Sequence, residues 1–174
     1  MIVMGFPGIG KSTMAGKESG YVDLDSSLFS RLGDQWFKAY ADVAYALDGQ
    51  GFNVFLSTHM EVVDFIGTLK SKYRSPVKVV VCAPCMGLEK FWIKRLEDRW
   101  WSAPTEENRR AWKSVEGRWS DVLLDLDMAC RRYGFRRLEI EGEGYDLGLM
   151  LKPLDGRKAV CKKAQVVNGP CHGL

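Results

Sequence analysis

The chain has 174 residues, of which 46% are hydrophobic, and it carries a formal net charge of +3. This length and composition predict one globular domain with a substantial hydrophobic core, and no apolar run is long enough to span a membrane. The short apolar stretch at the N-terminus leads directly into glycines, unlike a secretory signal. Five cysteines are an odd number and too sparse for a disulfide framework. We therefore expect a cytoplasmic protein with reduced thiols.

The positive charge is concentrated at the C-terminal end. Residues 152–174 contain five basic residues and one acidic residue, a balance of +4, so the preceding 151 residues sum to −1. Because the C-terminal segment also has little apolar periodicity, we predict a main domain over residues 1–151 and a loosely held basic extension over residues 152–174. Such an extension is able to contact nucleic acid, although short basic tails are often merely solvated.

The first predicted elements are an apolar strand over residues 1–4 and a helix that ends near Lys17. Between them the chain runs Gly5-Phe6-Pro7-Gly8-Ile9-Gly10-Lys11-Ser12, which fits the pattern G-x-x-x-x-G-K-[ST] of a phosphate-binding P-loop. Glycines let successive backbone N–H groups turn inward around phosphate oxygens, and the start of the helix presents its positive dipole end to the same anion. The alternative is a glycine-rich turn in which Lys-Ser follows by accident.

The pattern assigns a role to each position of this loop. Lys11 is expected to reach the β- and γ-phosphates, and the hydroxyl of Ser12 is expected to ligate Mg²⁺. The residues predicted to bind the nucleotide are Gly8, Ile9, Gly10, Lys11, Ser12 and Thr13.

A second strand, over residues 21–24, ends in an acidic and hydroxyl-rich cluster, Asp23-Leu24-Asp25-Ser26-Ser27. Ligands bind at the carboxyl ends of strands in open α/β sheets, and carboxylates two positions apart point the same way along extended backbone. We assign Asp23 to Mg²⁺, held through water, and Asp25 to accepting the proton of an attacking hydroxyl. Alternatively, Asp25 or Ser26 caps the next helix. Both roles are compatible if Ser26 or Ser27 is the cap.

Apolar residues at spacings of three and four then predict one core-facing helix, which Gly49 and Gly51 end. Its stripe consists of Phe29, Leu32, Trp36, Tyr40, Val43 and Leu47.

The third predicted strand, residues 53–57, leads into Ser57-Thr58-His59, where many P-loop proteins carry an Asp that supports Mg²⁺. No carboxylate occurs here before Glu61. Ser57 and Thr58 can therefore bind only a water molecule that is held by the metal, and Asp23 becomes the more important candidate for binding Mg²⁺. For His59, a ligand contact and an ordinary position at a helix start are equally open.

The rest of the chain continues the alternation of strands and helices. We predict a helix over residues 60–72, a buried central strand over 77–82, a helix over 87–101, a long helix from about 105 to 132 after Pro104, and a last strand over 135–141. This alternation predicts an α/β fold with a parallel sheet and right-handed crossovers.

The helix over residues 87–101 carries two arginines, Arg95 and Arg99, which are four positions apart and share a face. Guanidinium groups stabilise the charge that spreads over a transferring phosphoryl group, and a mobile segment that brings them over the phosphates also excludes water. The alternative is a solvated charged face that pairs with Glu97 and Asp98.

Cys82 and Cys85 form a C-x-x-C pair, but the pair follows a buried strand and has no second C-x-x-C. We interpret both as ordinary thiols, because a lone pair makes a poor zinc site and a redox role would need an exposed Cys85 of low pKa.

Among the six tryptophans, the helical spacing of Trp36, Trp112 and Trp119 predicts core positions, whereas Trp100 and Trp101 beside the two arginines are candidates for contacting a ligand.

With these motifs in view, the chain resembles the nucleoside-monophosphate-kinase-like branch of P-loop kinases, and more narrowly its small phage- and prophage-encoded members. The resemblance covers residues 1–151. It is carried by Gly-Phe-Pro-Gly-x-Gly-Lys-Ser, by Asp-x-Asp-Ser-Ser, by Ser-Thr-His and by a lid-like helix with the pattern Trp-Ile-x-Arg-Leu-x-x-Arg.

This resemblance implies a three-layer fold with a five-stranded parallel sheet, a helical lid over about residues 87–112, and ATP with Mg²⁺ as the donor. Asp23 and Asp25 match the paired acids of shikimate-kinase-like and polynucleotide-kinase-like relatives, where they serve the metal and the acceptor. Arg95 and Arg99 match lid arginines. The Asp-Gly that adenylate kinases carry after the third strand is missing, which argues against a standard adenylate kinase.

The function expected from the sequence is therefore transfer of the γ-phosphoryl group of ATP to a nucleotide or nucleoside-like acceptor. Two alternatives remain open. In the first, the acceptor is a hydroxyl of a polynucleotide, either a 5′ end or a hydroxymethylated base of phage DNA, and the basic tail contacts the DNA. In the second, the protein is a nucleotide-binding regulator with little turnover. The paired acids and the two arginines disfavour a regulator, because a switch needs no acceptor base.

Overall fold

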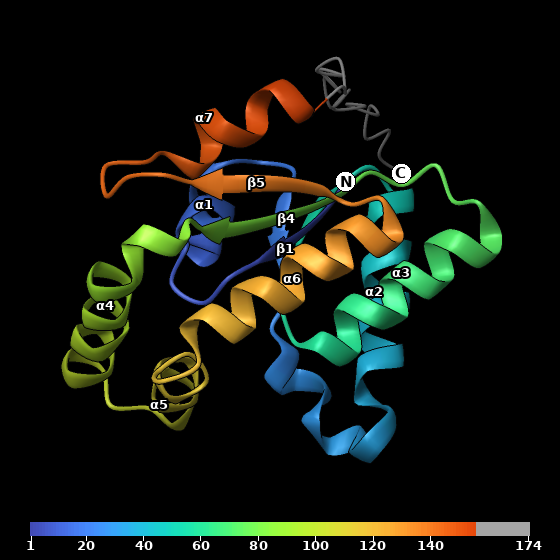
Figure 1. Ribbon diagram of the computed structural model, residues 1–174. Coiled ribbons are helices and arrows are strands. Elements are labelled where there is room, and N and C mark those ends of the chain that lie inside the picture. The colour runs from blue at the N-terminus through green and yellow to red at the C-terminus, as the bar shows by residue number, and fades with distance from the viewer. Residues whose placement is uncertain (156–174) are drawn as a thin grey trace, which may run out of the picture.

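The computed structural model describes residues 1–155 and confirms an α/β fold. Its five strands form one all-parallel sheet, which is flanked by helices (Figure 1). The order across the sheet is β2-β3-β1-β4-β5, so β1 lies in the centre. The strands are β1 (Ile2–Gly5), β2 (Tyr21–Asp23), β3 (Asn53–Ser57), β4 (Val79–Pro84) and β5 (Arg136–Ile140).

Helices cover both faces of the sheet. Figure 1 shows α6, which precedes β5, and α7, which follows it, on opposite sides of β5. The α-helices are α1 (Lys11–Lys17), α2 (Trp36–Gly49), α3 (Met60–Tyr73), α4 (Glu89–Ser102), α5 (Glu106–Lys113), α6 (Trp119–Tyr133) and α7 (Leu147–Leu151). The 3₁₀ segments are η1 (Ser26–Gln35), η2 (Met86–Leu88) and η3 (Lys152–Leu154).

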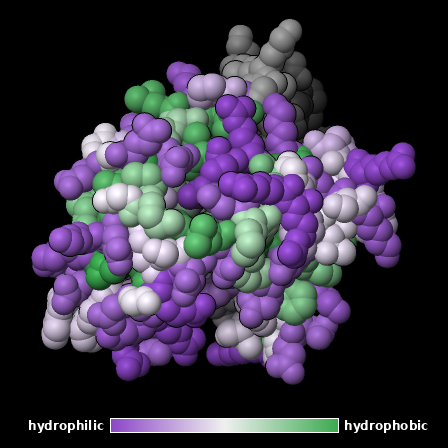
Figure 2. Space-filling model, in the orientation of Figure 1, coloured by the Kyte–Doolittle hydropathy of each residue, from purple (hydrophilic) through white to green (hydrophobic). Residues whose placement is uncertain are grey.

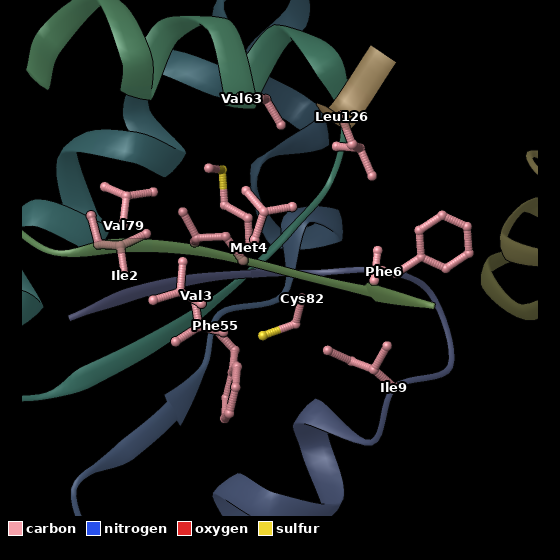
Figure 3. Close-up of a cluster of buried hydrophobic side chains, with 14 of the residues drawn as sticks. Ile2, Val3, Met4, Phe6, Ile9, Phe55, Val63, Val79, Cys82 and Leu126 are labelled. Carbon is pink, nitrogen blue, oxygen red and sulfur yellow. The ribbon is translucent and has the colours of Figure 1, made fainter. Parts of the chain in front are cut away.

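The hydrophobic core is built around β1, whose residues are all buried. In Figure 3, Phe55 and Cys82 point to one side of the sheet, toward Ile9, whereas Val63 of α3 and Leu126 of α6 lie on the other side. Every residue of β4 is buried as well, which confirms the prediction of a buried strand. A strand that is covered on both faces requires such a continuous apolar run.

The single helix predicted from the stripe of residues 29–47 was wrong in its first half. Residues 26–35 form η1, and Gly33 within it has the non-helical backbone angles φ 62° and ψ −147°. Leu32, a member of the stripe within η1, is consequently 55% exposed; Val43, which lies in the helical half, is 38% exposed. A glycine adopts this conformation without steric cost, so the chain bends there and α2 begins only at Trp36.

The long helix predicted from residue 105 to 132 is also interrupted. It forms two helices, α5 and α6, and Gly117 between them has a φ of 70°. The predicted break at Pro104 is confirmed, since Thr105 caps α5 by accepting a hydrogen bond from the backbone N–H of Asn108 at 3.2 Å.

The described fold continues past the boundary that was predicted at residue 151. Leu154 is buried, and its carbonyl accepts a hydrogen bond from Lys78 Nζ at 3.4 Å. The side chain of Asp155 accepts one from Asn53 Nδ2 at 2.8 Å. The first residues of the predicted extension therefore pack on the domain, and the remainder, residues 156–174, lies outside the described residues.

The face of the molecule in Figure 2 is mainly hydrophilic, with apolar residues scattered across it. Within residues 1–155, none of the helices combines the length and the apolar character that crossing a membrane demands.

The packing of α3 against α6 depends on Gly67, and this contact gives a first prediction. A Cβ atom at Gly67 would lie 2.3–2.5 Å from the ring of Tyr133, whose hydroxyl donates to Asp64 at 3.0 Å. Gly67→Ala must displace this ring, so we expect it to lower the free energy of unfolding by about 1–3 kcal/mol in urea denaturation.

Gly49→Ala is the matched control, because a Cβ at this exposed helical position meets nothing within 4 Å. It should be neutral or slightly stabilising. Equal unfolding midpoints for the two variants would show that Tyr133 is not held where the structure has it.

Candidate functional site

The glycine loop, residues 5–12, connects the central strand β1 to α1 and curls tightly back on itself. Gly8 and Gly10 have φ angles of 81° and 89°, a region that side chains disfavour. A Cβ at Gly5 would lie 2.6 Å from Ile9 Cδ1 and 2.7 Å from Lys11 Cδ. Ile9 is buried and anchors the loop in the core. The glycines are therefore required by the path of the backbone.

The side chain of Lys11 folds back along this loop. Its amine donates a hydrogen bond to the carbonyl of Gly5 at 2.9 Å. Burial lowers the pKa of Lys11, the carboxylate of Asp23 opposes that shift, and the guanidinium of Arg99 adds to it. The amine thus lies in the hollow of the loop as a partly desolvated donor, in which state its attraction to an anion is strengthened.

Ser12 and Asp23, which were both assigned to a metal, are brought together. Ser12 Oγ donates to Asp23 Oδ2 at 2.5 Å. Mg²⁺ keeps several waters and is usually held by one or two carboxylates together with phosphate oxygens, so a serine hydroxyl and one carboxylate fit its chemistry. Within residues 1–155 there is no cluster of three or more His, Cys, Asp or Glu side chains suited to a metal.

Asp25 takes the capping role that was the alternative interpretation. Its Oδ1 accepts from the backbone N–H of Ser27 at 2.8 Å, and its Oδ2 accepts from Ser27 Oγ at 2.7 Å. Asp25 is therefore the N-cap of η1, rather than Ser26 or Ser27. Its carboxylate is exposed, and its role toward an acceptor remains a prediction.

Tyr40 was predicted only as a core residue, and its hydroxyl was missed. The side chain is fully buried, and the hydroxyl contacts the ends of two strands. It donates to the carbonyl of Leu24 at 2.8 Å and accepts from the backbone N–H of Ser57 at 3.0 Å. Burial raises the pKa of Tyr40 to about 12; the backbone N–H and the side-chain hydroxyl of Ser57 oppose this rise, and the carboxylates of Asp23 and Asp25 add to it. The hydroxyl consequently stays protonated and able to donate.

The first half of α4 is docked on the glycine loop by Trp92, the first residue of the lid-like sequence pattern, whose contact with the loop the sequence did not predict. The Nε1–H of this buried tryptophan donates to the carbonyl of Pro7 at 2.8 Å. Beside it, Leu96 lies so near Gly8 that a Cβ there would come within 3.0 Å of Leu96 Cδ2. This part of α4 thus packs directly against the glycine loop.

Arg95 and Arg99, which were expected to act together, lie in different surroundings. The guanidinium of Arg95 lies over the rings of Trp92 and Tyr145, at 5.6 and 5.7 Å from their centroids. These rings stack on each other with centroids 5.9 Å apart. Arg99 is exposed, and its charge reaches Lys11, whose pKa it lowers. Of the two arginines, Arg99 is therefore the one whose charge is seen to act on Lys11.

Two further residues lie within electrostatic reach of Lys11. Glu107 of α5, which the sequence did not suggest, raises the pKa of Lys11. Burial lowers the pKa of His59, the carboxylate of Glu61 opposes that shift, and the charge of Lys11 adds to it. The ring of His59 meets Trp36 edge-on with centroids 5.5 Å apart. Charges from the start of α3 and from α5 thus contribute to the electrostatic environment of Lys11.

Of the tryptophans predicted to be core, Trp119 is buried, whereas Trp36 and Trp112 are half-buried. Trp100 stacks on Trp112 with centroids 5.3 Å apart, and Trp101 is 66% exposed. A ligand contact of Trp100 or Trp101 remains a prediction.

The C-x-x-C pair matches its interpretation as ordinary thiols. Cys82 and Cys85 are both free. Burial raises the pKa of Cys82 to about 12, which makes this thiol unreactive.

Two surface hollows lie away from the glycine loop. One follows the outer face of α4 and is lined by Glu89, Lys90, Ile93, Lys94 and Glu97. The other lies at the start of α6 and is lined by Glu89, Gly117, Arg118, Trp119, Ser120 and Asp121.

No protein-family model matches the chain, and a search of curated proteins finds no match. The case for a function therefore depends on the geometry of the site.

The burial of Lys11 predicts a pH-dependent stability. Because its folded-state pKa lies below the unfolded value of 10.5, the unfolded chain binds more protons between the two values, and stability rises with pH in that window. Lys11→Met removes this group. We expect the stability of the wild type relative to Lys11→Met to improve from pH 7 toward pH 10.5 in urea denaturation. A difference that is constant with pH would contradict a desolvated Lys11.

Proposed function

We propose that this protein is an ATP-dependent kinase of the P-loop type, with residues 5–12 as its phosphate-binding loop. Its reaction is transfer of the γ-phosphoryl group of ATP to a nucleotide or nucleoside-like acceptor. The observation that supports this best is the hydrogen bond from Ser12 to Asp23 beside Lys11. A glycine-rich turn with an accidental Lys-Ser has no need of a carboxylate on its serine.

Each residue of the site has a place in this reaction. Backbone N–H groups of the glycine loop and the amine of Lys11 bind the phosphates. Ser12 and Asp23 hold Mg²⁺, which when bound neutralises charge on the β- and γ-phosphates. Arg99 adds positive charge near the group that is transferred. The first half of α4, which packs on the loop through Trp92, helps to exclude water from it.

The chemical step requires one bond to form and one to break. The acceptor hydroxyl oxygen attacks the γ-phosphorus, the bond from that phosphorus to the bridging oxygen breaks, and ADP leaves. The hydroxyl proton passes to Asp25, whose exposed carboxylate is already oriented by its two hydrogen bonds from Ser27. Capping and proton acceptance are compatible, because a carboxylate has lone pairs for both.

A second acceptor class is favoured by charge. Residues 152–174 carry a balance of +4, whereas the rest of the chain carries −1. A basic segment attracts the phosphate backbone of DNA, so a polynucleotide hydroxyl, at a 5′ end or on a hydroxymethylated base, is the second candidate acceptor.

The test is a transfer screen with γ-labelled ATP and Mg²⁺ over mononucleotides, nucleosides, DNA 5′ ends and hydroxymethylated DNA. We expect label to appear on one of these classes with the wild type. Lys11→Met should lower that transfer by about 100-fold or more, because it removes a charge that stabilises the transition state. Absence of transfer to every acceptor by a folded wild type, or equal rates for the two proteins, would overturn the proposal.

The different surroundings of Arg95 and Arg99 predict different effects when each is replaced by alanine. Arg99→Ala should lower the rate of transfer with little change in melting temperature, since the side chain is exposed and acts through charge. Arg95→Ala should lower the melting temperature, because it removes packing against two aromatic rings, a loss of about 0.5–2 kcal/mol. Thermal denaturation and the transfer assay give the two readouts. The reverse assignment of effects would contradict this account of α4.

A further inference from the structure

The backbone hydrogen-bond ladder between strands β2 and β3 is interrupted next to the site. Their parallel register pairs Asp23 with Phe55, and Leu24 N donates to the carbonyl of Phe55 at 3.1 Å. Bonds of a parallel ladder are evenly spaced and alternate in direction along each strand. The next bond of this ladder would therefore run from Ser57 N to the carbonyl of Leu24.

The hydroxyl of Tyr40 stands in place of that bond. It accepts from Ser57 N and donates to the carbonyl of Leu24, so one oxygen atom is inserted into the ladder. Both backbone groups keep a partner, which buried backbone requires, while the two strand ends are held apart. The donated bond needs a protonated hydroxyl, which tyrosine keeps at neutral pH even at its ordinary pKa, and burial raises the pKa of Tyr40 further.

The separation falls between two groups that the proposed function needs. Asp23, which accepts from Ser12, is the last residue of β2. On β3, Ser57 Oγ is buried beside the hydroxyl of Tyr40, but its geometry makes no hydrogen bond within the described part of the chain. A buried hydroxyl without a partner is costly, and a water bound to a metal at Ser12 and Asp23 would supply one.

We propose that Tyr40 is a positioning residue, whose hydroxyl sets the spacing between Asp23 and Ser57 and so keeps the Mg²⁺ site open. This inference rests on the proposed function, because it concerns the cation that accompanies ATP. Tyr40 touches neither ATP nor the acceptor in this role; it acts through the backbone of Leu24 and Ser57.

Tyr40→Phe tests the inference, since it deletes the hydroxyl and keeps the ring that packs against Phe29 and Trp36. Tyr45→Phe is the matched control, because Tyr45 lies on the same helix and its hydroxyl donates to a carbonyl away from the site, that of Ile66 at 3.5 Å.

The measurement is titration of each protein with Mn²⁺ as the probe, followed by electron paramagnetic resonance in the presence of a non-hydrolysable ATP analogue. We expect the dissociation constant for Mn²⁺ to rise by about tenfold or more in Tyr40→Phe. The affinity for the analogue without metal should stay unchanged, and Tyr45→Phe should match the wild type in both. A merely structural role of the hydroxyl would weaken both affinities or neither.

The outcomes separate the two proposals. Equal Mn²⁺ affinities for Tyr40→Phe and Tyr45→Phe would overturn the inference and leave the proposed function standing. A wild type that binds neither the analogue nor Mn²⁺ would overturn both.

If Tyr40→Phe does not fold, the wild type provides the readout by nuclear magnetic resonance. Addition of Mg²⁺ to the complex with the analogue should then shift the amide resonances of Leu24 and Ser57, and leave that of Ile66 in place. Unchanged resonances for Leu24 and Ser57 would overturn the inference.

Discussion

The sharp reversal of the chain after β1 is the constraint on which the rest of the site depends. The backbone leaves the most buried strand of the sheet and must turn within a few residues to begin α1. Glycines permit the turn, Ile9 anchors it in the core, and the amine of Lys11 closes it on the carbonyl of Gly5. This turn fixes both the position of the only lysine in the glycine loop and the direction in which Ser12 points.

The strand order then decides which side chains meet this turn. Since β1 lies between β3 and β4, the segments that follow those strands border the glycine loop. The segment after β3 brings His59, and the segment after β4 brings Trp92 against Pro7. From β2, one strand further out, Asp23 reaches Ser12, and Tyr40 holds the ends of β2 and β3 at a fixed spacing. The site is thus assembled from four connections of one parallel sheet.

Sequence patterns predicted the strands and the parallel sheet, and they assigned Ser12 and Asp23 to one metal, because strand ends and a spaced motif are local signals; the hydrogen bond between the two side chains comes from the structure. They missed the bonds made by Trp92 and Tyr40, whose partners are distant in sequence and are chosen by tertiary packing. Tyr40 even matched a helical core stripe, and the pattern gave no sign of what its hydroxyl contacts. The helix breaks at Gly33 and Gly117 were missed for a related reason: an isolated glycine does not interrupt an apolar stripe, although it permits a left-handed residue.

The central claim is that the glycine loop binds phosphate, and a calorimetric series of adenosine, AMP, ADP and ATP in excess Mg²⁺ tests it most directly. Each charge-assisted hydrogen bond to a phosphate contributes about 1.5–3 kcal/mol, roughly tenfold or more in affinity. The account predicts that affinity rises steeply along the series, with ATP bound at least about 100-fold more tightly than adenosine. Equal affinities for adenosine and ATP, or no binding of ATP, would contradict it.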